Sequence, residues 1–226
     1  MPGSKKVGND IYGVKGKRPF RDDAPETGFR RSDHYHRYFR GYTEVRIEKP
    51  NGGYRIKRLY TAPWQVQDCS DRVYWSGRVL CVLLVALAAV LYVLALTNAA
   101  SSGNACWYVA LPGLPSAVLL VYCAGATLIW IFTPRRMTYY DRESGATRLR
   151  MAALITAAAL ALTVLAKLFY LITTAGAAVG PELLTAAELL GAAAAIFAEC
   201  RYIRSLRYRE ERNDTPLPDG EYYEIG

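Results

Sequence analysis

A lysine and a glutamate stand in an otherwise apolar stretch, TVLAKLFYLITTAGAAVGPELLTAAELL, which covers residues 163–190. Lys167 precedes a turn of small residues and Glu188 follows it. An ammonium and a carboxylate in hydrocarbon are costly unless they neutralise each other, and ionisable residues inside a membrane often mark a solute or proton pathway. The two residues could therefore form a structural ion pair, or they could belong to an ion, proton or small-solute pathway.

The elements that would position this pair follow from the segregated composition of the chain. Residues 79–200 are dominated by Ala, Leu and Val, whereas residues 1–75 and 201–226 are dense in charged residues and tyrosine. A helix needs about 20 apolar residues to cross a bilayer. Four stretches meet or nearly meet this length. They are residues 79–97, 107–132, 151–172 and 182–200. We therefore predict an all-α transmembrane protein, a four-helix membrane bundle occupying residues 76–200.

The orientation follows from the distribution of positive charge. None of the 28 Lys and Arg residues lies in the connections 98–106 and 173–181. The 134–150 connection carries five arginines, and the chain after Cys200 carries five more. Because cytoplasmic connections carry the excess of Lys and Arg, we expect a multi-pass protein of the cytoplasmic membrane with both termini in the cytoplasm. The arginines that flank the spans are expected to contact anionic lipid headgroups: Arg135, Arg136, Arg201, Arg204 and Arg207.

The polar ends divide into three segments. Residues 1–41 have little apolar periodicity and are predicted to be a disordered basic tail. Residues 42–75 contain two alternating runs around Asn51-Gly52, which predicts a small cytoplasmic β-hairpin with Glu48 opposite Arg55 and Ile47 opposite Ile56. Residues 201–226 read as a basic cytoplasmic tail, and its last residues, EYYEIG, are either a docking peptide or a solubilising end.

Helical geometry predicts that Lys167 pairs with Glu188. In an antiparallel hairpin that turns near Ala177, residues whose numbers sum to about 355 lie at equal depth. Thr156, Thr163 and Lys167 follow helical spacing with Tyr170 and Thr174, and Thr185 and Glu188 do so with Gly191, Ala195 and Glu199. The two polar stripes can therefore face each other. Glu182 and Glu199, nearer the ends of the fourth span, are expected to be solvated or matched to nearby arginines.

A polar pocket could form around this pair. Pro112 and Pro115 remove backbone hydrogen bonds near the predicted depth of Lys167, and the carbonyls they leave would need partners. Tyr92 of the first span lies near the same level. The candidate pocket residues beside the pair are Tyr92, Pro112, Pro115, Tyr170 and Thr185.

The sequence lacks the motifs that several classes of chemistry require. The five cysteines and two histidines lack metal-ligand spacing, so we expect no metal site and no cofactor. Motifs for phosphate binding, nucleophilic catalysis and metalloprotease chemistry are absent from the sequence, so we expect no enzyme activity. The net charge of +8 is explained by topology and lipid contact, so a nucleic-acid partner is not expected.

The segment YFRGYTEVRIEKPNGGYRIKRLYTAPW ahead of four spans resembles an arrangement in uncharacterised small four-span membrane proteins of Gram-positive bacteria. The resemblance covers residues 36–200 and implies a bacterial membrane location without any activity. The leading hypothesis is a non-enzymatic membrane scaffold or accessory protein that contacts the lipid bilayer, a partner protein or another copy of itself. The alternative is a component of an ion or small-solute transporter or channel that uses Lys167 and Glu188.

Overall fold

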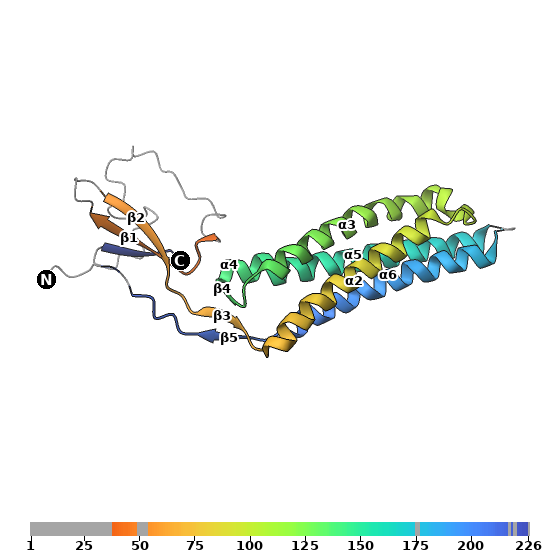
Figure 1. Ribbon diagram of the computed structural model, residues 1–226. Helices are drawn as coiled ribbons and strands as arrows, with labels where there is room; N and C mark the ends of the chain where they lie inside the picture. The colour runs from red at the N-terminus through yellow and green to blue at the C-terminus, as the bar shows by residue number, and fades with distance from the viewer. Residues whose placement is uncertain (1–37, 49–53, 175–176, 217, 219–220, 226) are drawn as a thin grey trace, which may run out of the picture. The chain divides into compact units, whose positions relative to one another are not determined.

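The computed structural model describes residues 38–48, 54–174, 177–216, 218 and 221–225. The described chain forms two compact units. One unit is built from strands that lie far apart in the sequence, and the other contains the long helices (Figure 1). The predicted disorder of residues 1–37 falls outside the described residues.

The helical unit contains four long helices. They are α2 (Asp71–Thr97), α3 (Trp107–Phe132), α5 (Arg148–Thr173) and α6 (Val179–Ser205), with a 3-10 turn, η2 (Ser102–Ala105), between the first two. A short π-helical turn, η3 (Glu143–Thr147), precedes α5. All four predicted spans are confirmed as helices long and apolar enough to cross a membrane.

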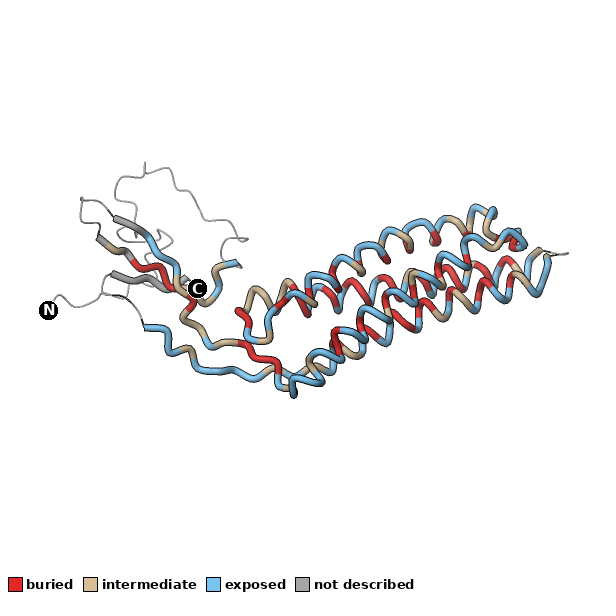
Figure 2. Tube along the Cα trace, viewed as in Figure 1, coloured by how far each residue is buried: buried red, intermediate tan, exposed pale blue. Residues whose placement is uncertain are grey.

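The helices pack in the order α2, α6, α5, α3, because α6 contacts both α2 and α5, and α5 also contacts α3. Buried residues follow helical spacing on each helix, as in Thr156, Leu160, Thr163 and Lys167 of α5. In Figure 2 the buried stretches of the helices lie mainly on the sides that meet neighbouring helices, and the exposed stretches lie on the outer sides. The outward positions are mostly apolar; Leu162 of α5, for example, is 57% exposed.

The other unit holds two three-stranded sheets rather than the single hairpin that the sequence predicts. In the first sheet, β1 (Tyr42–Glu48) lies between β2 (Tyr54–Tyr60) and β6 (Glu221–Ile225). In the second, β3 (Trp64–Gln67) lies between β4 (Arg136–Met137) and β5 (Tyr208–Glu211). A single helical turn, α4 (Tyr139–Arg142), follows β4. The predicted basic tail therefore supplies two strands, and the final residues pair with β1 of their own chain.

The register of the hairpin differs from the predicted one by one residue. Glu48 pairs with Tyr54 and Ile47 with Arg55, whereas the sequence predicts Glu48 opposite Arg55. The observed register places Glu44 directly opposite Arg58, whose Nε lies 3.0 Å from the buried Glu44 Oε1. A one-residue slip would lose this pair. The predicted Asn51-Gly52 turn itself lies outside the described residues.

The chain before β1 is also part of this unit. Residues 38–41, the end of the predicted disordered tail, fold against the first sheet. Phe39 O accepts a hydrogen bond from Tyr42 N, and Gly41 O accepts from Thr61 N and Ala62 N. Gly41 has a φ of 79°, a left-handed conformation that favours glycine. This turn fixes the entry of β1.

Candidate functional site

Lys167 pairs with Glu182, so the predicted pairing with Glu188 is wrong. Lys167 Nζ lies 2.7 Å from Glu182 Oε2, and each side chain is 1% exposed. The ammonium also donates to Ser101 Oγ at 2.5 Å. Both charges are therefore buried and neutralised within the helical unit.

The carboxylate of Glu182 is bound by the connection between α2 and α3. It accepts hydrogen bonds from Ser101 Oγ at 2.9 Å, Ser102 Oγ at 3.3 Å and Gly103 N at 2.8 Å. Ser102 Oγ also lies 2.9 Å from the hydroxyl oxygen of Tyr170. We call this group the end clasp; its members are Ser101, Ser102, Gly103, Lys167, Tyr170 and Glu182.

Glycine is required at one position of the end clasp. A Cβ on Gly103 would lie 2.8 Å from Glu182 Oε2 and 2.8 Å from Tyr170 Cδ1. The backbone can thus approach the carboxylate closely enough for its N–H to donate. The clasp ties α5, α6 and η2 together at one end of the helices.

Two physical reasons explain why the argument from equal depth in the membrane predicted the wrong partner for Lys167. Depth arguments apply to Cα atoms, whereas the long aliphatic stem of lysine carries its ammonium toward the end of the helix. Glu182 lies in the first turn of α6, where Lys167 can reach it. The buried face of α6 contains Glu182, Thr185 and Leu189, whereas Glu188 falls to one side and is only half-buried.

The predicted pocket residues do not form one pocket. Tyr92 donates to Gly113 O at 2.7 Å. With Lys167 it lines a small cavity of about 110 Å³ whose walls come from α2, α3, α5, α6 and η2. Tyr170 belongs to the end clasp. Thr185 is buried and its hydroxyl donates to the backbone oxygen of Glu182, at 3.0 Å.

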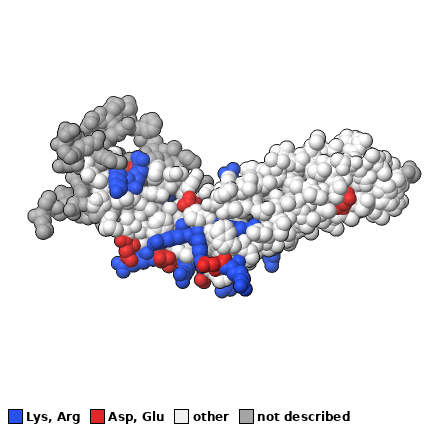
Figure 3. All heavy atoms as spheres, in the orientation of Figure 1, with Lys and Arg blue, Asp and Glu red and all other residues white. Residues whose placement is uncertain are grey.

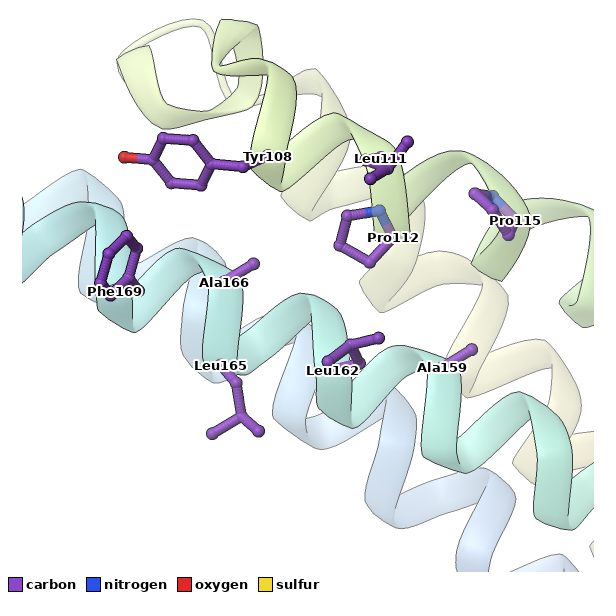
Figure 4. A pocket seen from close by; sticks show the side chains of 9 residues that line it. All are labelled: Tyr108, Leu111, Pro112, Pro115, Ala159, Leu162, Leu165, Ala166 and Phe169. Carbon is purple, nitrogen blue, oxygen red and sulfur yellow. The ribbon is translucent and has the colours of Figure 1, made fainter.

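Pro112 and Pro115 line a different hollow. It is an apolar groove of about 600 Å³ between α3 and α5, shown in Figure 4. Leu162 and Phe169 lie on its α5 side with the small residues Ala159 and Ala166. The Pro112 ring lies between the two helices in this view. The prolines therefore shape an apolar surface rather than a polar pocket around Lys167.

Glu188 has a polar atom without a hydrogen-bond partner. Its Oε2 is buried, and none of the described residues donates a hydrogen bond to it. The residue as a whole is half-buried on α6. This differs sharply from Glu182 on the same helix, whose carboxylate receives four donors.

Glu199 is a third carboxylate of α6, and the sequence argument misplaced it at a solvated end. It is fully buried, with 0% exposure. Thr127 Oγ1 donates to its Oε1 at 2.9 Å, and Cys123 Sγ lies 3.6 Å from its Oε2. Within the described residues, its hydrogen bonds come from neutral donors. The signal that could have found it is the spacing of Leu189, Ala192, Ile196 and Glu199, which lie three, four and three residues apart on the buried face of α6.

Arg78 is a further buried residue that the sequence argument missed. It is 3% exposed, and its guanidinium donates to the backbone oxygens of Trp130, Ile131 and Thr133. It also lies over the rings of Tyr74, 3.8 Å from the ring centroid, and Trp130, at 5.0 Å. Arg78 thus caps the carboxyl end of α3, where a cation meets the negative end of the helix dipole.

The arginines predicted to contact headgroups are at or near the surface. Arg201, Arg204 and Arg207 are exposed at the end of α6 and just beyond it. In the strand unit, Arg135 Nε donates to Gln67 O at 3.3 Å, and Arg136 stacks over the Trp64 ring. On the face drawn in Figure 3, the helices show few charged atoms along most of their length. The blue basic atoms lie mainly at one end of the helices and on the strand unit.

The described residues include no cluster of three or more His, Cys, Asp or Glu side chains that could hold a metal ion. None of the five cysteines, all of which lie among the described residues, forms a disulfide bond. The chain matches no protein-family model, no curated protein and no solved structure. The resemblance to four-span proteins of Gram-positive bacteria stays a prediction.

Proposed function

We propose that the protein is a multi-pass scaffold or accessory protein of a bacterial cytoplasmic membrane, without enzyme activity. The observation that supports the topology in this proposal is the second sheet. Strand β3 precedes the first long helix, β4 lies between the second and the third, and β5 follows the fourth. Strands that share a sheet must lie on one side of a membrane, and four crossings satisfy this condition.

From the positive charge we infer that this side is the cytoplasm. The connection 134–150 and the chain after Cys200 hold the arginines, whereas the connections 98–106 and 173–181 hold no Lys or Arg. In this orientation the exposed arginines at the end of α6 meet anionic headgroups, each contributing about 1 kcal/mol of attraction near the surface. The strand unit then forms a cytoplasmic surface for a partner protein.

The end clasp supports a structural role for the buried charges. Lys167 and Glu182 are both 1% exposed, and serine hydroxyls and a backbone N–H complete their hydrogen bonds. A buried pair of this kind fixes which helices pack together and in which register. This favours a scaffold over a transport pathway, in which charged groups need access to the solute.

Thiol labelling of intact cells tests the orientation. Cys106, at the start of α3, is half-buried and lies on the predicted outer side; Cys69, which is also half-buried, lies on the predicted inner side. A membrane-impermeant maleimide should label Cys106 in intact cells and Cys69 only after permeabilisation. Cys200 is buried and gives no information. Labelling of Cys69 in intact cells would overturn the assignment.

One observation favours a second candidate, a component of an ion or small-solute pathway. The cavity of about 110 Å³ reaches Lys167 and also contains the polar residues Tyr92, Asn104 and Thr163. That volume could hold a few water molecules, each of which takes about 30 Å³. Liposomes containing the wild-type protein should then conduct protons or chloride faster than empty liposomes. Equal rates would contradict this alternative.

A further inference from the structure

The buried carboxylate oxygen of Glu188 lacks a hydrogen-bond donor among the described residues. On insertion scales an acidic residue near the centre of a membrane helix is strongly disfavoured. Such residues are normally paired with a basic group, a backbone carbonyl or a water-filled cavity. Glu188 Oε2 is buried without a donor among the described residues, and Glu188 is not among the residues that line the cavity beside Lys167.

The helix surface around Glu188 suits close contact with another helix. Leu184 is 55% exposed, and Ala187 and Ala194 are exposed on the same side of α6. Gly191, one turn from Glu188, is half-buried. Small residues let helix backbones approach closely in membranes. We define Leu184, Ala187, Glu188, Gly191 and Ala194 as the Glu188 face.

A second copy of this chain does not supply the missing charge. Within the described helices, every basic residue except Lys167 lies near one end of the helices. This is the end opposite η2, where the helices connect in sequence to the strand unit. Glu188 lies about 9 Å from Glu182 along the helix axis, deep within α6. Lys167 itself is buried and bound to Glu182. A basic group at the depth of Glu188 would therefore come from another protein.

We propose that the Glu188 face binds a transmembrane helix of a partner protein that carries a lysine or arginine within the hydrocarbon. The carboxylate accepts the hydrogen bonds of that cation, and the alanines and Gly191 admit the partner backbone. This inference rests on the proposed function, since it names the contact by which the accessory protein joins its partner. It also gives Glu188 a role distinct from that of Glu182.

The experiment uses the full chain in phosphatidylcholine liposomes with a synthetic helix as the probe. The probe is a Leu/Ala helix of about 20 residues with one central lysine, and its controls carry leucine or glutamate at that position. Resonance energy transfer is measured from the probe to a fluorophore on Cys106 in a Cys69→Ser background. The lysine helix should bind wild-type protein about tenfold more tightly than the leucine helix does.

Three variants decide the outcome. Glu188→Leu should abolish the preference for lysine, and Glu188→Lys should reverse it in favour of the glutamate helix. The matched control, Glu188→Leu with Leu190→Glu, moves the carboxylate to another face of α6; Leu190 is 57% exposed. If this control binds the lysine helix as tightly as wild type does, the carboxylate alone is sufficient and the proposed face is wrong.

The remaining outcomes also decide the proposal. Equal binding of the lysine and leucine helices to wild type would overturn it. Energy transfer between two copies of the protein would also overturn it if Glu188→Leu abolished that transfer, because the face would then join identical chains. None of these results depends on orientation, so thiol labelling can still support the proposed function when this inference fails. Each variant is first checked for wild-type helicity by circular dichroism.

Discussion

At the scale of single residues, two buried carboxylates on α6 have opposite electrostatic environments. Glu182 faces an ammonium at 2.7 Å and three donors from the α2–α3 connection. Glu199 is equally buried, but its described hydrogen bonds come from a hydroxyl and a thiol. Since burying a charge without a counter-charge is costly, the same substitution should affect the two sites differently.

Glu182→Gln should destabilise the helical unit strongly. It removes the counter-charge of buried Lys167, and breaking a buried pair on one side costs about 3–5 kcal/mol. The combined change Lys167→Met and Glu182→Gln should cost less than the sum of the two single changes, since no uncompensated charge remains. Unfolding of the protein in detergent micelles measures all three variants; additive losses would show that the pair is not coupled.

Glu199→Gln should leave the stability unchanged or raise it. Glutamine keeps an oxygen that can accept the hydrogen bond from Thr127 and has no charge to bury. The same unfolding measurement applies, and Glu182→Gln is its matched comparison on the same helix. A loss at Glu199 as large as the loss at Glu182 would indicate a counter-charge that the described residues do not include.

At the scale of the elements, the carboxyl end of α3 depends on a residue of another helix. Arg78 lies near the start of α2 and donates to three backbone oxygens at the end of α3. A helix leaves its last four carbonyl groups without partners in the helix, and a buried guanidinium can serve several of them. The contact therefore fixes α2 against the end of α3.

Arg78→Met should destabilise this junction by about 1.5–3 kcal/mol, the typical contribution of a hydrogen bond to a charged group. Arg78→Lys should retain part of the stability because it keeps the charge but has no planar fork of donors. Hydrogen exchange of the amides near Trp130 and Thr133 measures the local effect. A lysine variant as unstable as the methionine variant would assign the contribution to guanidinium geometry alone.

At the scale of the whole molecule, three separate stretches of sequence form the strand unit. They are the described parts of Met1–Gln67, Pro134–Arg142 and Tyr208–Gly226. The last stretch supplies β6 to the first sheet and β5 to the second, and the middle stretch supplies β4 to the second. The cytoplasmic surface that we propose thus depends on the chain after the fourth helix.

Removal of residues 208–226 should loosen both sheets and leave the helices intact. β1 would lose its pairing with β6, and β3 its pairing with β5, so their backbone groups would lie at open edges. Hydrogen exchange of Val45 and Val66 should accelerate, whereas the helical signal in circular dichroism should fall no more than the shortening requires. Unchanged protection of Val45 would show that β6 contributes nothing to the first sheet.

The sequence predicted the four long helices and the hairpin between β1 and β2, because these features depend on local composition and alternation. It also predicted that Lys167 is buried and that Thr156, Thr163 and Tyr170 share its face, since helical spacing fixes which residues lie on one side. The apolar length of each helix likewise required no tertiary information.

Only the tertiary structure decided which charges meet. The choice of Glu182 over Glu188 depends on the reach of a lysine stem and on donors in η2, which lies more than sixty residues before Lys167 in the chain. The burial of Arg78 and Glu199, the strands of the tail and the one-residue shift in the hairpin likewise depend on distant partners. Periodicity assigns a side chain to a face of its own helix, but contacts between elements decide what that face meets.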